Sequence, residues 1–165
     1  MESASLLGID VGGTAVKVGL FATDGRLLGL HTTNIPVDSP RPGWAEIDPQ
    51  RWLEAIPLGV RAVLAQAGVV PSQVAAIGLS AMIGTVTALD AQGRPLRPAI
   101  AYFDTRSAPE AAWMLEQAPE IPQITGNRVI SGNTSLASAL WIRQHEPEIY
   151  AQTATLATTN TFLFH

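Results

Sequence analysis

The chain has 165 residues, which is enough for one domain with a sizeable core. With 47% hydrophobic and 15% charged residues, the composition excludes a disordered chain. The net charge of −4 argues against a nucleic-acid partner or an anionic membrane surface, and the absence of cysteine excludes disulfides and thiolate metal sites. The sequence contains no run of about 18 apolar residues that would predict a membrane span. It also lacks the basic segment at the N-terminus that would indicate a signal peptide. We therefore expect a cytoplasmic protein.

The first part of the chain predicts three consecutive antiparallel strands. Apolar runs at 5–10, 15–22 and 27–33 are separated by two turns. The second turn contains the pair Asp24-Gly25, which is typical of a tight two-residue hairpin. We expect a small meander at the start of the fold.

The first turn carries the residues that indicate chemistry. Asp10 ends the first strand and is placed to hold a hydrated Mg²⁺, while Gly12 and Gly13 let backbone N–H groups approach a phosphate. Thr14 adds a hydroxyl, and Lys17 follows in the second strand as a phosphate contact or a solvent-facing side chain. The alternative is a glycine hairpin with an incidental aspartate, because isolated glycine-rich matches are weakly specific.

The remaining elements predict an α/β protein. Prolines mark 34–46 as a loop, in which Trp44 is a hydrophobic lid over the next helix or a ligand contact. Ser107 and Glu110 predict a capping box. The predicted elements are a helix at 49–67, a buried strand at 74–80 parallel to the first strand, a strand at 85–89, an apolar run at 99–103, helices at 107–117 and 134–146 around an irregular stretch at 118–133, a strand at 154–158, and a helix beginning at 159 or 160. Because this last helix has about one turn, we expect a longer protein.

Six segments follow one another in the order and spacing of a known family. They are residues 8–17, 42–52, 77–80, 89–106, 124–127 and 140–148. The first is similar to a phosphate-loop pattern of glycine-isoleucine-aspartate-x-glycine-threonine-serine-x-x-lysine. The second is similar to a tryptophan-x-glutamate-x-aspartate-proline segment that leads into a helix. Over essentially its whole length, the chain resembles the N-terminal half of the FGGY carbohydrate kinases.

The resemblance implies an actin-like ATPase, ribonuclease-H-like fold, with a mixed sheet of three antiparallel strands followed by βα crossovers. Residues 1–165 are then the N-terminal, substrate-side domain, and the nucleotide-holding C-terminal domain is absent. The implied function is phosphorylation of a sugar, sugar acid or polyol with ATP and Mg²⁺. Asp10 is expected to serve the metal, and Gly12, Gly13, Thr14 and Lys17 the phosphates. The resemblance places the general-base aspartate beyond residue 165 and leaves a homodimer open.

Substrate contacts are expected where the fourth strand and the 99–106 segment end. Met82 and Gly84 occupy positions where related sequences carry polar groups including a histidine, which disfavours a xylulokinase. Tyr102 replaces a tryptophan and can stack on a polyol. Asp104 and Arg106 are a substrate-facing pair or, as an alternative, a salt bridge at the start of the helix at 107.

Two alternative functions stay open. The double glycine at 12–13 is closer to that of hexokinase-like and ROK sugar kinases, although these are not expected to carry segments 44–52 and 98–106. The second alternative is a non-catalytic binding module with the actin fold.

Overall fold

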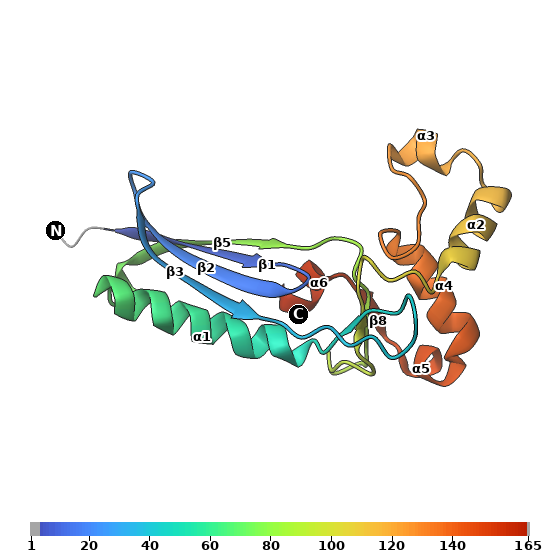
Figure 1. Ribbon diagram of the computed structural model, residues 1–165, viewed down its shortest axis with the longest axis horizontal. Coiled ribbons are helices and arrows are strands. Elements are labelled where there is room, and N and C mark those ends of the chain that lie inside the picture. The colour runs from blue at the N-terminus through green and yellow to red at the C-terminus, as the bar shows by residue number, and fades with distance from the viewer. Residues whose placement is uncertain (1–3, 165) are drawn as a thin grey trace. The chain divides into compact units, whose positions relative to one another are not determined.

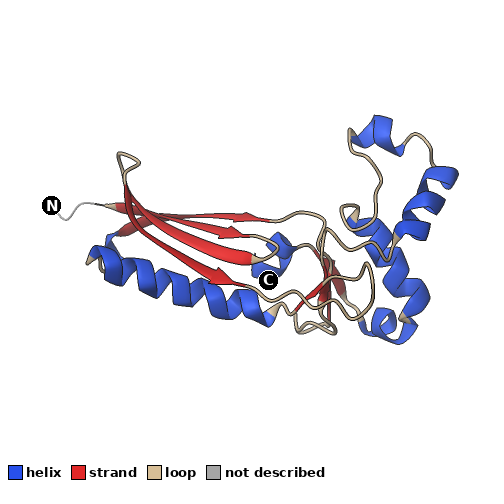
Figure 2. Ribbon diagram, in the orientation of Figure 1, coloured by secondary structure: helices blue, strands red, loops and turns tan. Residues whose placement is uncertain are grey.

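The computed structural model describes residues 4–164, which form two compact units. Unit 1 consists of residues 1–36 and 50–81, and unit 2 of residues 37–49 and 82–165. The chain therefore passes between the units three times. Figure 1 labels the elements, and Figure 2 separates helices from strands.

Unit 1 is a four-stranded mixed sheet with one long helix. The strands are β1 (Ser5–Val11), β2 (Ala15–Ala22), β3 (Leu27–Asn34) and β5 (Val74–Ala81), and their order across the sheet is β3-β2-β1-β5. The pairs β1–β2 and β2–β3 are antiparallel, whereas β5 runs parallel to β1. The predicted meander and the parallel pairing are confirmed, but the predicted two-residue turn at Asp24-Gly25 was wrong. The Ala22 N–H donates to the Arg26 carbonyl at 2.8 Å and so closes a three-residue loop, in which Gly25 has a positive φ and Asp24 does not.

Helix α1 (Gln50–Ala67) connects β3 to β5 by way of the short helix η1 (Pro71–Gln73) and packs against β2 and β3. It lies along the sheet in Figure 1. Its buried side chains include Trp52 and Val63, which face the inward residues of the strands. Alternation in β1 sends Leu7 and Val11 into this core. The amphipathic pattern predicted this helix because one of its faces is apolar.

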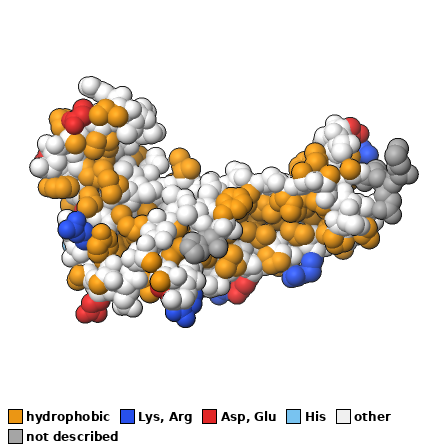
Figure 3. Space-filling view, turned by 180° about the vertical axis from the view of Figure 1, so that it is seen from behind, with side chains coloured by type: hydrophobic (Ala, Val, Ile, Leu, Met, Phe, Trp, Pro, Cys, Tyr) orange, Lys and Arg blue, Asp and Glu red, His pale blue; other side chains and the backbone are white. Residues whose placement is uncertain are grey.

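Strand β5 is mostly exposed, so the prediction of a buried strand was wrong. Ile77, in its middle, is 65% exposed. Among the described residues of unit 1, the one long helix, α1, packs against β2 and β3, and no helix covers β5. Other apolar side chains on the sheet, such as Leu6 and Leu30, are exposed as well. Figure 3 shows hydrophobic side chains gathered over the sheet.

Unit 2 combines two short sheets with five helices among the described residues. Strand β4 (Glu46–Ile47) pairs with β7 (Ala99–Ile100), and β6 (Thr87–Leu89) pairs with β8 (Thr155–Ala157). The helices are α2 (Ala108–Gln117), α3 (Ile121–Thr125), α4 (Ser135–His145), α5 (Pro147–Gln152) and α6 (Thr159–Phe164). Two hydrophobic clusters hold these elements together, one around Ile100 and Trp141, the other around Met114 and Val129.

Two local predictions in unit 2 were wrong, and one helix was not predicted. Ser107 precedes α2 but makes no side-chain cap, because its hydroxyl lies 3.0 Å from that of Ser131. The stretch 118–133 was expected to be irregular but contains α3. Helix α4 ends before Pro147, as predicted, and the unpredicted α5 begins at Pro147, since proline is well suited to the first turn of a helix. Within residues 4–164, no helix is long and apolar enough to cross a membrane.

Candidate functional site

A polar row crosses the sheet of unit 1 near the carboxyl end of β1. In the strand register, Asp10 lies opposite Lys17 on β2 and Ser80 on β5, and Lys17 lies opposite Thr32 on β3. Residues directly opposite each other in neighbouring strands share a face of the sheet. All four residues are exposed. The row therefore offers one carboxylate, one ammonium and two hydroxyls to solvent.

A row of glycines borders the polar row and hollows the sheet. Gly8 lies opposite Gly19 on β2 and Gly78 on β5. Along their strands, each of these glycines is two residues from a residue of the polar row. The ring of Phe21 lies over Gly8 and Gly19, whereas the space above Gly78 is open. The three glycines, Phe21, Asp10 and Lys17 all line a groove of about 490 Å³. No pattern in the sequence indicates this groove, because it appears only when the three strands are set in register.

The turn between β1 and β2 offers fewer backbone donors than its glycines suggest. The Gly12 N–H donates to the carbonyl of Ala15 at 2.9 Å, so this amide is occupied in the turn. A Cβ at Gly12 would lie only 3.1 Å from the same carbonyl oxygen, so this tight turn favours glycine. Gly13 and Thr14 form the bend itself and supply the remaining N–H groups.

The metal-binding capacity of this region is limited to one carboxylate. Among residues 4–164, no three His, Cys, Asp or Glu side chains gather into a metal-binding group. Mg²⁺ usually keeps several waters and is held by one or two carboxylates together with phosphate oxygens of a substrate. An exposed Asp10 beside the Gly13–Thr14 bend fits the carboxylate part of that donor set.

In unit 2, three loop segments meet where substrate contacts were predicted. Gly84 has a φ of +84° and is buried, and a Cβ there would lie 2.9 Å from the carbonyl oxygen of Gly132. Gly132 has a φ of +71°, and a Cβ there would meet the carbonyl oxygens of Tyr102 and Asp104. Both positions require glycine, because side chains strain a positive φ and neighbouring backbone fills the space. The segments around 84, 103 and 132 are thus in close contact.

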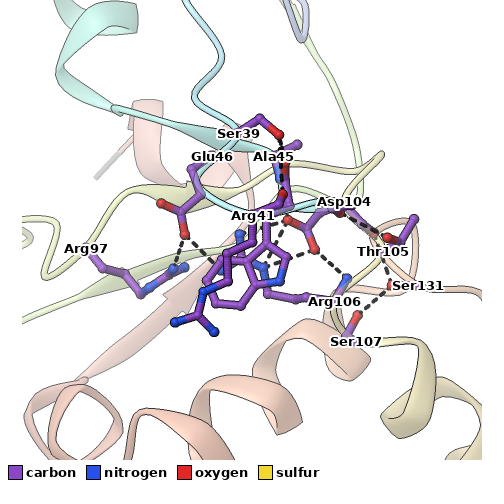
Figure 4. Close-up of polar contacts among 12 residues, drawn as sticks. Ser39, Arg41, Ala45, Glu46, Arg97, Asp104, Thr105, Arg106, Ser107 and Ser131 are labelled. Carbon is purple, nitrogen blue, oxygen red and sulfur yellow. Dashed lines mark hydrogen bonds and ion pairs between the residues drawn. The ribbon is translucent and has the colours of Figure 1, made fainter.

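The Asp104 carboxylate is buried and occupied by its own chain (Figure 4). It accepts the Ala45 N–H at 2.6 Å and the Arg106 N–H at 2.7 Å. The Arg106 guanidinium donates to it through Nε at 3.0 Å and Nη2 at 2.8 Å. Because these hydrogen bonds involve a charged carboxylate, they hold the Asp104 side chain firmly in place. Of the two interpretations of Asp104 and Arg106, the structure favours the buried salt bridge over a substrate-facing pair.

Arg106 extends this network to the 37–49 segment. Its Nη1 lies 2.8 Å from Glu46 Oε1, which also accepts from Arg97 at 2.6 Å. Its guanidinium stacks 3.7 Å from the ring centre of Trp44 and 5.0 Å from that of Trp141. Trp44 packs edge-on against Trp141 of α4, so the expectation of a lid over the next helix, α1, was wrong. Sequence reasoning missed Glu46, because its partners lie some sixty residues away in the chain.

The remaining predicted substrate residues are accessible to different degrees. Tyr102 is 43% exposed and makes a T-shaped contact with the exposed Phe103, with ring centres 5.0 Å apart. Met82 is half-buried. Gly84 lines a cavity of about 740 Å³ in unit 2, and Tyr102, Asp104 and Arg106 do not. The structure thus gathers the segments that carry these residues without directing all of the side chains to one pocket.

Comparison with known proteins decides the family. Residues 5–165 match the N-terminal domain of the FGGY family of carbohydrate kinases. The chain belongs to this family. The match favours FGGY over the ROK alternative and agrees with the mixed sheet of an actin-like ATPase fold.

Curated FGGY relatives include two kinases from Escherichia coli K12. Xylulose kinase is 37% identical over 146 residues, which are 88% of this chain and 30% of the relative. L-xylulose/3-keto-L-gulonate kinase is 33% identical over 159 residues, which are 95% of this chain and 32% of the relative. The chain thus spans about a third of the length of these relatives.

Solved FGGY structures superpose closely on the chain. A xyloylose kinase from Brucella ovis is 33% identical with a TM-score of 0.89, covering 97% of this chain and 33% of that protein. Glycerol kinase from Plasmodium falciparum, solved with ADP, is 25% identical with a TM-score of 0.85, covering 98% and 33%. The arrangement of strands and helices is therefore that of the FGGY kinases.

Proposed function

We propose that the chain is the N-terminal part of a kinase that transfers phosphate from ATP to a hydroxyl of a sugar, sugar acid or polyol. The observation that carries the proposal is the exposed Asp10–Lys17 pair beside the Gly13–Thr14 bend, in a chain of the FGGY family. The chain covers 30% and 32% of the two Escherichia coli relatives, which supports a further part that completes the site.

Each residue of unit 1 has a role in this proposal. Asp10 would hold a hydrated Mg²⁺, and such an ion would supply positive charge against the phosphates. The amides of Gly13 and Thr14 donate to phosphate oxygens. Gly12 shapes the turn that presents them. Lys17, one strand away, provides a positive charge on the same face.

In unit 2, Met82, Gly84 and Tyr102 are proposed on the substrate side. Asp104 and Arg106 act as positioning residues, since their buried pair joins the Tyr102 segment to the Trp44 segment. The proton of the substrate hydroxyl is proposed to pass to a carboxylate in the part of the protein that this chain does not span.

ADP release by the full-length protein tests the proposal across a panel of ketoses, aldonates and polyols. We expect ADP release with at least one of them. For Asp10→Asn we expect kcat to fall by about 10²–10³-fold, because charge stabilisation is lost. Asp24→Asn, an exposed carboxylate in the β2–β3 turn, is the matched control and should leave kcat unchanged. Absence of ADP release with every compound would refute the kinase, and would favour the non-catalytic module. Residues 1–165 alone should show no turnover.

A further inference from the structure

Residues 101–104 form a tight turn that carries two exposed aromatic rings. The Asp104 N–H donates to the Ala101 carbonyl at 3.0 Å and closes the turn. Tyr102 and Phe103 are its two central residues, and their side chains lie at the surface, 43% and 41% exposed. Exposed aromatic side chains on a backbone that is held in place are typical of binding surfaces.

Both ends of the 101–104 turn are held by Ala45. The Ala101 N–H donates to the Ala45 carbonyl at 3.0 Å, and the Ala45 N–H donates to the Asp104 carboxylate at 2.6 Å. Figure 4 shows Ala45 beside Asp104, and also the Ser131 hydroxyl, which donates to the Asp104 carbonyl at 3.0 Å. The backbone that carries the two rings is therefore fixed, and the freedom that remains is in the side chains.

The turn lies close to the Gly84 segment by way of Gly132. A Cβ at Gly132 would meet the Tyr102 carbonyl, and a Cβ at Gly84 would meet the Gly132 carbonyl. Gly84 lines the cavity of about 740 Å³ in unit 2. The backbone of Tyr102 thus belongs to the group of loops on which the substrate side is proposed, while its ring stands outside the lining of that cavity.

The ring of Tyr102 packs against the ring of Phe103. Their centres are 5.0 Å apart and their planes meet at 88°, which is an edge-to-face contact. Within residues 4–164, the Tyr102 hydroxyl makes no hydrogen bond that would fix the ring in another way. Edge-to-face pairs of this geometry are favourable beyond the surface area that they bury. The Phe103 ring therefore restricts the rotation of the Tyr102 side chain on a backbone that is already fixed.

We infer that Phe103 is a positioning residue, which holds the Tyr102 ring in the orientation that stacks on a C–H face of the substrate. The inference rests on the proposed function, because that function puts Tyr102 on the substrate side. A ring that is oriented before binding loses less side-chain entropy when the substrate binds. Without Phe103, the Tyr102 ring occupies several rotamers, and the substrate binds only the fraction with the correct one. The consequence is a higher KM at an unchanged kcat.

Steady-state kinetics of the full-length protein test the inference, with ADP release measured on a panel headed by D-xylulose, D-gluconate and glycerol. On the panel compound that is phosphorylated with the highest kcat/KM, Phe103→Leu should raise KM by about three- to tenfold, the range for one edge-to-face contact, and leave kcat unchanged. Phe103→Tyr keeps a ring at this position and should keep the original KM. Trp113→Leu removes an exposed aromatic side chain of α2 outside the turn, and this matched control should change neither constant.

A double-mutant cycle separates positioning from direct contact with the substrate. Tyr102→Leu alone should raise KM, and Phe103→Leu should then have no further effect, because the ring that it positions is gone. Urea unfolding supplies the structural readout. Because both side chains are exposed, the midpoint of Phe103→Leu should lie close to that of Trp113→Leu.

Several results would overturn the inference and leave the kinase proposal intact, because the unaltered protein still releases ADP in each of them. They are an unchanged KM in Phe103→Leu or in Tyr102→Leu, a lower kcat in place of a higher KM, and an undiminished effect of Phe103→Leu in the Tyr102→Leu background. A much lower urea midpoint for Phe103→Leu would make Phe103 a structural residue and also overturn the inference. Absence of ADP release with every compound of the panel would refute the proposed function, and the inference with it.

Discussion

The buried carboxylate of Asp104 allows a quantitative prediction about the stability of unit 2. Asp104→Ala removes the acceptor of the Ala45 N–H and the principal partner of the Arg106 guanidinium, whose side chain is 1% exposed. Arg106 would keep only Glu46 as a counter-charge. Breaking a buried ion pair by removing one partner costs about 3–5 kcal/mol, because the other charge stays buried.

Urea unfolding measures this cost. With a slope of roughly 1–3 kcal/mol per molar urea, a loss of about 3 kcal/mol or more lowers the midpoint by at least about 1 M. Hydrogen exchange of the Ala45 amide provides a local measurement, and its protection should be lost in Asp104→Ala. Asp104→Asn should be intermediate, because an amide oxygen still accepts a hydrogen bond without the charge.

Glu54→Ala is the matched control for removal of a carboxylate. Glu54 pairs with Arg51 at 3.5 Å on the surface of α1, and its side chain is 66% exposed. Exposed pairs contribute at most about 1 kcal/mol, so its midpoint should change little. If Asp104→Ala unfolds at the same urea concentration as Glu54→Ala, the account of the buried pair is refuted.

Two further predictions concern a glycine and a pH dependence. Gly132→Ala should destabilise the protein by about 1–3 kcal/mol more than Gly126→Ala. Both glycines have a positive φ, but only at Gly132 would a Cβ meet backbone, including the Asp104 carbonyl oxygen at 2.6 Å; equal melting temperatures would contradict this. The N–H of Arg94 and its guanidinium hold the pKa of Asp90 below the ordinary aspartate value. This stabilisation is present above the ordinary pKa and lost as pH falls through the lowered one. A carboxyl NMR titration should show the low midpoint, and Arg94→Ala should raise it; an ordinary midpoint before substitution would contradict the prediction.

Local sequence signals predicted most of the secondary structure. Asp24-Gly25 indicated the hairpin, the periodicity of 49–67 indicated α1, and the crossover between strands indicated the parallel pairing of 74–80 with β1. Each of these signals acts between residues close in sequence, or follows from a connection of known length and handedness. Helix α5 was not predicted, because the proline that ends the pattern of one helix also starts another.

Properties that depend on distant residues were harder to predict. An apolar run at 74–80 indicates a strand but not whether a helix covers it, and in this structure Ile77 is exposed. Ser107 had a suitable glutamate three residues later, yet its hydroxyl lies beside Ser131, 24 residues away. The role of Asp104 depends on Ala45, 59 residues earlier. Side-chain pairing over such separations leaves no pattern in a single sequence.

The alternating path of the chain between the two units limits how the protein can be divided. Residues 37–49 belong to unit 2 but lie in the sequence between β3 and α1 of unit 1. A shortened chain that ends at residue 81 would contain every strand of unit 1 and also Glu46, without the arginines that neutralise it. A short flexible linker in place of 37–49 is therefore needed before unit 1 can be studied by itself. The same insertion makes unit 2 a discontinuous domain. Its segment 37–49 is synthesised well before residues 82–165, so it can pair with its partner strand only after that later part of the chain has been made.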